Sequence, residues 1–186
     1  LLLFLVVAPF FTSFLLRTLS WKIILGDSGI FLGPLKDVGV LPEDFRLLAT
    51  PIAVISGITY NFLPFMTLPI YVSLEKIDRR LVEAAEDLYA TTFGAFRRIT
   101  LPLSLPGVFA GSLLTFIPAV GDYVNAEFLG NPDTTMIGNV IQNRFLAQND
   151  YPTASALSFI LMAGILVAVA VYARLLGTEE LTAGGV

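Results

Sequence analysis

The stretch ASALSFILMAGILVAVAVYARLL, residues 154–176, decides the fold class of this chain. A helix needs about 20 apolar residues to cross the roughly 30 Å of hydrocarbon in a membrane. This run reaches that length, and Arg174 near its end is its only charged residue. We therefore predict a membrane-spanning helix over residues 154–176, followed by a short polar tail rich in glycine.

Three more apolar runs lie upstream, over residues 1–16, 47–74 and 103–128. The chain opens inside the first run without a Met, a basic segment or a cleavage site. We therefore expect a span that is cut short rather than a signal peptide. The second run contains Pro51, Pro64 and Pro69, and we expect a kinked helix that neighbouring groups support.

The run over residues 103–128 combines proline with small residues and holds a carboxylate. Small residues let two membrane helices approach closely, so we expect this span to pack tightly against a neighbour. The residues concerned are Pro106, Gly107, Gly111, Pro118, Gly121 and Asp122. Since lipid leaves no backbone hydrogen bond unpaired, the four runs together predict an all-α integral membrane protein.

The composition excludes several other classes of protein. Hydrophobic residues make up 55% of the 186 residues and charged residues only 14%, whereas soluble domains carry roughly 25% charged residues. Histidine and cysteine are absent, which excludes imidazole or thiolate chemistry. The net charge of −4 and the lack of a phosphate-binding glycine loop argue against nucleic acid as a partner and against ATP binding by this chain.

The polar segments between the runs predict the topology. Residues 75–98 are rich in basic side chains, and the positive-inside rule favours the cytoplasm for such a segment. Alternation then places residues 17–46 and 125–152 outside. No connecting segment is long enough for a separate folded domain, so we treat residues 1–186 as a single domain. The basic side chains are Lys76, Arg79, Arg80, Arg97 and Arg98.

Residues 75–102 carry the pattern of two short helices. Asp78 is suited to cap the first helix, and Thr91 or Thr92 to cap the second. The first helix holds Glu83-Ala84-Ala85, and the second leads to Ile99-Thr100-Leu101-Pro102. On pattern alone, an ordinary amphipathic loop explains the segment equally well.

The spacing of these residues resembles the E-A-A-x(3)-G-x(9)-I-x-L-P loop of permease subunits in binding-protein-dependent ABC importers, which have a MetI-like transmembrane domain. The glycine of that pattern falls on Tyr89, and we expect Gly94 to relieve the chain instead. The resemblance implies a cytoplasmic helix-turn-helix over residues 75–102 that docks on an ATPase subunit. The coupling residues implied are Glu83, Ala84, Ala85, Leu88 and Gly94.

The resemblance also implies the architecture and the partners. Such permeases usually have six spans, so we expect this chain to hold about four of them and to lack the first two. They are multi-pass proteins of the bacterial inner membrane. They work with a second permease subunit, a dimer of ATPase subunits and an extracytoplasmic solute-binding protein. No cofactor is expected, and ATP hydrolysis is expected on the separate ATPase rather than on this chain.

Several segments outside this loop resemble the spermidine/putrescine branch of these permeases. They are Pro9-Phe10, Arg17-Thr18, Tyr60 to Met66, Gly121 to Val124, Met136 to Ile141 and Asp150-Tyr151-Pro152. Polyamines are flexible polycations, so a path for them needs carboxylates and aromatic faces. The resemblance and this chemistry together predict polyamines as the cargo.

An acidic excess over residues 122–150 suits the entry of such a cation. We expect the substrate path to be lined by Asp122, Tyr123, Glu127, Tyr60 and Asn61. Asp122 is the foremost candidate because a carboxylate within the membrane is costly unless it serves a pathway or a buried partner. The alternatives are an Asp122 that is hydrated just beyond the hydrocarbon, and tyrosines that anchor helix ends at the interface.

Other functions remain open on the sequence. A permease of the same family with another cargo, such as ferric iron, thiamine, sulfate or phosphonate, would carry the same loop. An intramembrane aspartyl protease wants two facing aspartates, and only Asp122 lies within an apolar run. A passive channel or a scaffold would have no use for a loop that docks an ATPase.

Overall fold

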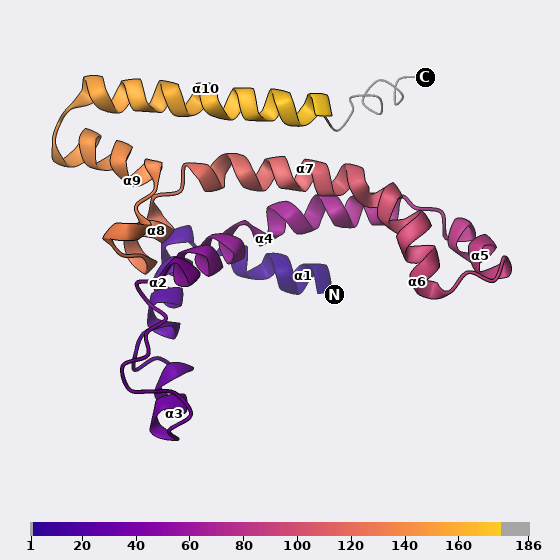
Figure 1. The fold of residues 1–186 in the computed structure, drawn as a ribbon, viewed down its shortest axis with the longest axis horizontal. Coiled ribbons are helices and arrows are strands. Elements are labelled where there is room, and N and C mark those ends of the chain that lie inside the picture. The colour runs from indigo at the N-terminus through magenta and orange to yellow at the C-terminus, as the bar shows by residue number, and fades with distance from the viewer. Residues whose placement is uncertain (1, 176–186) are drawn as a thin grey trace.

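The computed structural model describes residues 2–175, which form helices joined by turns, without a strand in that range (Figure 1). The long helices are α4 (Pro51–Glu75), α7 (Leu101–Val120) and α10 (Tyr151–Leu175). The short helices are α1 (Leu2–Val7), α2 (Phe14–Ile24), α3 (Leu32–Asp37), α5 (Arg79–Asp87), α6 (Thr92–Ala95), α8 (Val124–Leu129) and α9 (Ile137–Gln142). The all-α prediction is confirmed.

Three helical stretches are long and apolar enough to cross a membrane, namely Pro51–Glu75, Thr92–Val120 and Tyr151–Arg174. A bent pair, Leu3–Phe11 with Phe14–Ile24, brings the number to four if it counts as one span. These stretches coincide with the four apolar runs of the sequence. The described residues thus hold three to four candidate spans, in agreement with the predicted number.

The first apolar run is not one straight helix, because it belongs to the bent pair Leu3–Phe11 and Phe14–Ile24. Its two parts meet at an angle of 103°. The helix stops in a 3-10 turn, Ala8–Phe11, which contains Pro9. Thr12 then takes an extended conformation, and its hydroxyl donates to the Pro9 carbonyl at 2.6 Å. This side-chain hydrogen bond replaces helical pairing and turns the chain.

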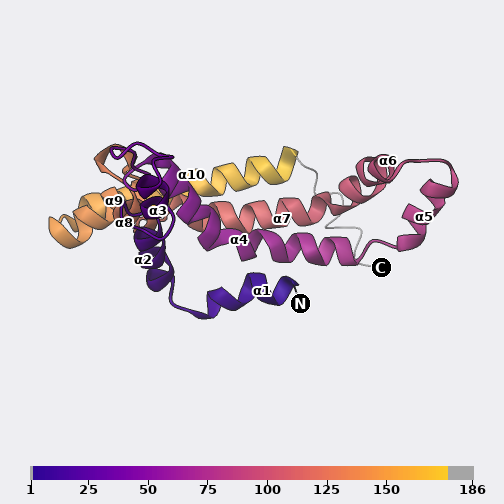
Figure 2. The same cartoon turned by 90° about the horizontal axis from the view of Figure 1, so that it is seen from below.

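Helices α4 and α7 lie side by side in both views (Figures 1 and 2). Two glycines of α7 permit the approach. A Cβ atom on Gly107 would lie 2.6 Å from the Pro69 carbonyl oxygen, and one on Gly111 would lie 3.0 Å from that of Met66. The prediction that small residues make a close helix contact is confirmed. Pro64 and Pro69 lie within α4, and Thr50 caps its first turn by accepting from the Ala53 amide.

The third predicted span, residues 103–128, has different ends in the structure. It begins earlier, because α6, a π turn (Phe96–Thr100) and α7 form one helical stretch. In this turn the Leu101 amide reaches the Phe96 carbonyl directly before Pro102, which has no N–H to donate. The span also ends earlier, at Val120, and the chain restarts as α8.

Helix α10 stands largely apart from the other described helices. Its contact with α7 is an edge-to-face pair of Phe109 and Tyr172 rings, 6.0 Å apart. Asp150 precedes its first residue and accepts from the Thr153 amide at 3.3 Å. Hydrogen bonds from Thr153, and more weakly the Arg144 charge, lower the pKa of the Asp150 carboxyl. The predicted end at residue 176 and the glycine-rich tail lie outside the described residues.

The turn between α5 and α6 lies at the opposite end of the long helices from α8 and α9 (Figure 2). We predict that the first end faces the cytoplasm and the second the outside. Thr92→Cys and Ala147→Cys test this in the full-length protein with other cysteines replaced, because both positions are exposed. In intact cells an impermeant thiol reagent should label only Ala147→Cys, and both should react after lysis. Labelling of both in intact cells contradicts the topology.

Candidate functional site

A buried polar network joins α2, α4 and α8, and the Asn125 side chain is at its centre. Asn61 Nδ2 donates to Asn125 Oδ1 at 3.0 Å and to Thr18 Oγ1 at 3.1 Å. Asn125 Nδ2 in turn donates to Asp122 Oδ2. The Thr18, Asn61, Asn125 and Asp122 side chains are all buried. Three helices that are distant in sequence are thus held by one set of amide and hydroxyl groups.

Asp122 occupies the break between α7 and α8 and caps α8. Its Oδ1 accepts from the Val124 amide at 2.9 Å and from the Asn125 amide at 3.1 Å. These amides have no partner within the helix, so a carboxylate at this point stabilises the helix start. Asp122 is 7% exposed and lies beyond the last residue of α7. Both of its carboxylate oxygens accept hydrogen bonds from this chain, Oδ1 from the two amides and Oδ2 from the Asn125 side chain.

Close packing between α4 and α8 keeps the network away from water. A Cβ atom on Gly57 would lie 2.4 Å from Leu129 Cδ1 and 2.8 Å from Asn125 Oδ1, so this position has no room for a side chain. Beside it, Ala53, Val54, Ala126 and Leu129 form a buried apolar cluster. The apolar cluster and the polar network are consecutive parts of one interface.

Tyr60 belongs to an aromatic cluster beside the network. Its ring lies 5.6 Å from the Phe10 ring and 5.5 Å from the Trp21 ring. The Arg17 guanidinium stacks on Phe10 at 4.1 Å. Tyr60 is half-buried in these contacts, and its neighbour Asn61 faces the network, so the chain turns two predicted path residues toward α1 and α2.

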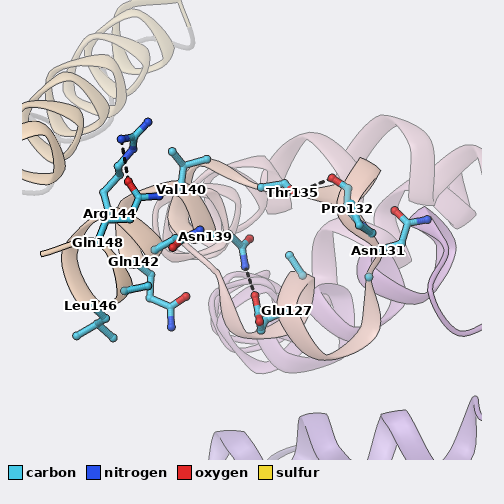
Figure 3. A pocket seen from close by; sticks show the side chains of 14 residues that line it. Glu127, Asn131, Pro132, Thr135, Asn139, Val140, Gln142, Arg144, Leu146 and Gln148 are labelled. Atoms are coloured by element: carbon cyan, nitrogen blue, oxygen red, sulfur yellow. Dashed lines mark hydrogen bonds between the residues drawn. The ribbon is translucent and has the colours of Figure 1, made fainter. Parts of the chain in front are cut away.

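A cavity of about 700 Å³ lies between α8, the following turn, α9 and the helical turn after α9 (Figure 3). Glu127 lines it, and Glu127 Oε2 accepts from Asn139 Nδ2 at 3.2 Å. On another wall Arg144 donates to Gln148 Oε1 at 2.8 Å and lies 3.6 Å from Asp150. The remaining polar side chains of the lining are the amides of Asn131, Gln142 and Asn143 and the hydroxyl of Thr135. Such a lining offers carboxylate and carbonyl oxygens to a hydrogen-bond donor.

Helix α8 connects the network with the cavity, because its Asn125 side chain lies in the network and its Glu127 side chain lines the cavity. Tyr123 is exposed at the start of α8, and its carbonyl accepts from Asn139 Nδ2 at 3.0 Å. The structure thus brings Asp122, Tyr123 and Glu127 together at one end of the long helices. Sequence reasoning missed Thr18, Asn125 and Asn139, whose signal is limited to a polar side chain within or beside an apolar run.

The predicted coupling segment forms two short helices, as expected. Asp78 Oδ1 accepts from the Arg80 amide at 2.9 Å, and Thr91 Oγ1 accepts from the Gly94 amide at 3.2 Å, so both predicted caps are confirmed. On α5, Glu83 and Ala84 are exposed and Ala85 is half-buried. Leu88 directly follows the last residue of α5, and its side chain is 81% exposed.

The expectation that Gly94 relieves the chain in place of Tyr89 is wrong. Gly94 lies within α6, whereas Tyr89 itself adopts the left-handed conformation with φ of 63°. The cause is local, because α5 ends at Asp87 and the turn must follow directly.

Comparison with known proteins gives the family. The sequence profile described as "Binding-protein-dependent transport system inner membrane component" matches residues 1–176. The chain therefore belongs to this family of inner-membrane transport components.

Individual relatives narrow the similarity. The chain is 47% identical to the spermidine/putrescine transport system permease protein PotB of Haemophilus influenzae, over 94% of this chain and 61% of that protein. It is 43% identical to PotB of Escherichia coli, over 87% of this chain and 58% of that protein. PotC of Escherichia coli, a permease protein of the same system by name, is 36% identical over 58% of this chain and 40% of PotC. The chain spans about three fifths of the PotB relatives.

The network generates a prediction about stability. Asn125→Leu keeps the branched shape of the side chain but removes one of the two partners of Asn61 Nδ2 and the partner of Asp122 Oδ2. Buried polar groups without partners destabilise a protein by about 1 to 3 kcal/mol each, so the thermal unfolding midpoint in detergent should fall clearly. Asn143→Leu is the matched control, because Asn143 is exposed and its variant should unfold near the wild-type midpoint. Equal midpoints for both variants contradict the structural role of the network.

Proposed function

We propose that this chain is part of a permease subunit of an ATP-driven importer of polyamines, and that it couples transport to a separate ATPase. The observation that carries the proposal is the separation of two surfaces by one long helical stretch. Thr92–Val120 runs from the exposed end of α5 and α6 to the break that holds Asp122. One end offers a docking surface, and the other offers acidic and amide groups for a cation.

The docking surface consists of Glu83, Ala84 and Ala85 on α5, Leu88 directly after it, and Gly94 on α6. Small side chains allow close approach, an exposed leucine suits a groove, and a carboxylate orients the partner. In the assembled transporter, two ATPase subunits would bind two such surfaces, one on this chain and one on a second permease subunit. Membership of a binding-protein-dependent family supports an extracytoplasmic solute-binding protein as the further partner.

The proposed substrate path begins at the α8 end. Glu127 is exposed at the cavity, where its carboxylate accepts from Asn139 and can also meet an ammonium group. Asp122 caps α8 and adds negative charge near the start of the same helix. Tyr123, Tyr60 and Asn61 complete the proposed path with aromatic and amide groups. The spermidine/putrescine names of the PotB relatives support polyamines over an anionic cargo.

Coupling is tested on α5. Glu83→Lys should leave membrane insertion intact and separate ATP hydrolysis from uptake, because the reversed charge opposes docking. Ala85→Trp should prevent docking by bulk. Glu75→Lys is the matched control, since it makes the same charge change at an exposed site at the end of α4. The measurements are substrate-stimulated ATPase activity and uptake, and normal values in both Glu83→Lys and Ala85→Trp contradict the coupling role.

The path is tested with carboxylates at the α8 end. Glu127→Gln keeps the shape but removes the charge, and we expect uptake of radiolabelled spermidine at sub-saturating concentration to fall about two- to five-fold. Asp133→Asn is the matched control, because it removes a nearby exposed charge that does not line the cavity. Equal effects of the two variants would mean that general electrostatic attraction of spermidine to the acidic surface, rather than binding in the cavity, sets the rate of uptake.

Asp122→Asn extends this test. It keeps an oxygen for the α8 amides but removes both the charge and the acceptor of Asn125 Nδ2, so uptake is compared per assembled complex, where it should slow strongly, and Asp122→Glu should retain part of the activity. Wild-type uptake by Asp122→Asn removes this residue from the proposed path.

A further inference from the structure

Tyr89 holds an unfavourable backbone conformation. Its φ of 63° lies in the left-handed region, where the Cβ atom of any residue but glycine crowds the backbone. The surrounding hydrogen bonds impose this geometry. The Tyr89 amide donates to the Glu86 carbonyl at 2.9 Å, and the Ala90 amide donates to the Ala85 carbonyl at 3.0 Å. A helix end closed in this way favours glycine at the position of Tyr89.

The other non-glycine residues with positive φ in residues 2–175 are Ala49 and Asn149, and both make compensating contacts. The Ala49 amide donates to the Leu129 carbonyl at 2.9 Å, and its own carbonyl accepts from Asn131 Nδ2 at 2.8 Å. Asn149 is of a type that tolerates this conformation, and its Oδ1 accepts from the Tyr151 hydroxyl at 3.1 Å. These contacts account for the geometry at both positions.

The Tyr89 side chain has no such compensation within the described chain, because it is 98% exposed. Its neighbours on the same turn are also exposed and apolar, with Leu88 at 81% and Phe93 at 72%. A strained residue that contacts nothing in its own chain points to a contact outside it. Aromatic side chains are the residues that most often anchor protein interfaces.

We propose that the Tyr89 ring is an anchor that enters an apolar pocket on the ATPase subunit, flanked by Leu88 and Phe93, and sets the affinity of this permease for that subunit. The inference rests on the proposed function, which supplies the partner. The turn between α5 and α6 lies beyond the ends of α4 and α7 (Figure 2). The charged side chains directly before Tyr89 are the exposed carboxylates Glu86 and Asp87, whereas Arg79 and Arg80 lie at the other end of α5, so the charge beside the ring opposes binding to an anionic lipid surface. Both observations favour a protein partner.

The test compares variants of the full-length permease, assembled with its partner subunits in nanodiscs, for binding of the purified ATPase. Tyr89→Gly removes both the ring and the backbone strain, so thermal stability should stay equal or rise, while Kd for the ATPase should weaken about ten-fold. Tyr89→Asn should behave likewise. Tyr89→Phe should stay within about two-fold of wild type. Equal or tighter binding by Tyr89→Gly overturns the proposal.

Two controls separate the possible failures. Ala85→Trp should abolish binding, and if it does not, the docking surface itself is wrong. If Ala85→Trp abolishes binding while Tyr89→Gly binds normally, only the role of Tyr89 is wrong. A fluorophore on Thr92→Cys, an exposed position that leaves the Tyr89 ring in place, should shift its emission when the ATPase is added. A shift caused instead by vesicles of anionic lipid, without the ATPase, assigns Tyr89 to the membrane and overturns the proposal.

Discussion

The position of α8 depends on one amide side chain, that of Asn125. It accepts from Asn61 on α4 and donates to Asp122 before α8, and Thr18 of α2 closes the group at 3.4 Å from its Oδ1. In a setting that excludes water, each of these groups needs a protein partner, since an unpaired one costs more free energy than a hydrogen bond returns. Except for Asn61 Oδ1, which has no partner in the described chain, the buried side-chain groups of the network are paired, and this pairing restricts the arrangement of the three helices. The cavity beside Glu127 exists because α8 is held in one of those arrangements.

The apolar spans followed from the sequence because their length is set by the bilayer, which no tertiary contact alters. Their ends did not. The third span was predicted to continue to residue 128, past Asp122 and Glu127, whereas the helix stops at Val120 and the Asp122 carboxylate caps a new helix. The first run likewise reads as one stretch, but Pro9 and Thr12 turn it by side-chain and ring chemistry. A hydropathy average does not register either of these single-residue effects.

In the candidate site, too, some features could be predicted from the sequence and others could not. Asp122 stood out because a lone carboxylate near an apolar run is costly, and it is indeed buried. The network around it was missed because Thr18 and Asn61 meet Asn125 through contacts between distant parts of the sequence, although the bond from Asn125 to Asp122 itself spans only three residues. Caps at Asp78 and Thr91 were predictable, since each bonds within three residues. The left-handed turn at Tyr89 was assigned to Gly94 instead, because residue type and helix end indicated different positions.

The proposed coupling needs a rigid connection between the two ends, and the contact between α4 and α7 provides it. Gly107 and Gly111 bring the two backbones so close that no side chain could be added between them, and interfaces of this density shift as units rather than bend. A displacement of α6 by a docked ATPase would therefore move α7 together with α4. At the far end, α4 and α7 are joined to α8 in two different ways. Helix α4 holds α8 through Asn61 and Asn125, whereas α7 joins α8 only through the short break at Gly121 and Asp122. Movement of the pair would then be taken up at this break, beside the cavity and Glu127, which is where a transporter would need to open or close a path.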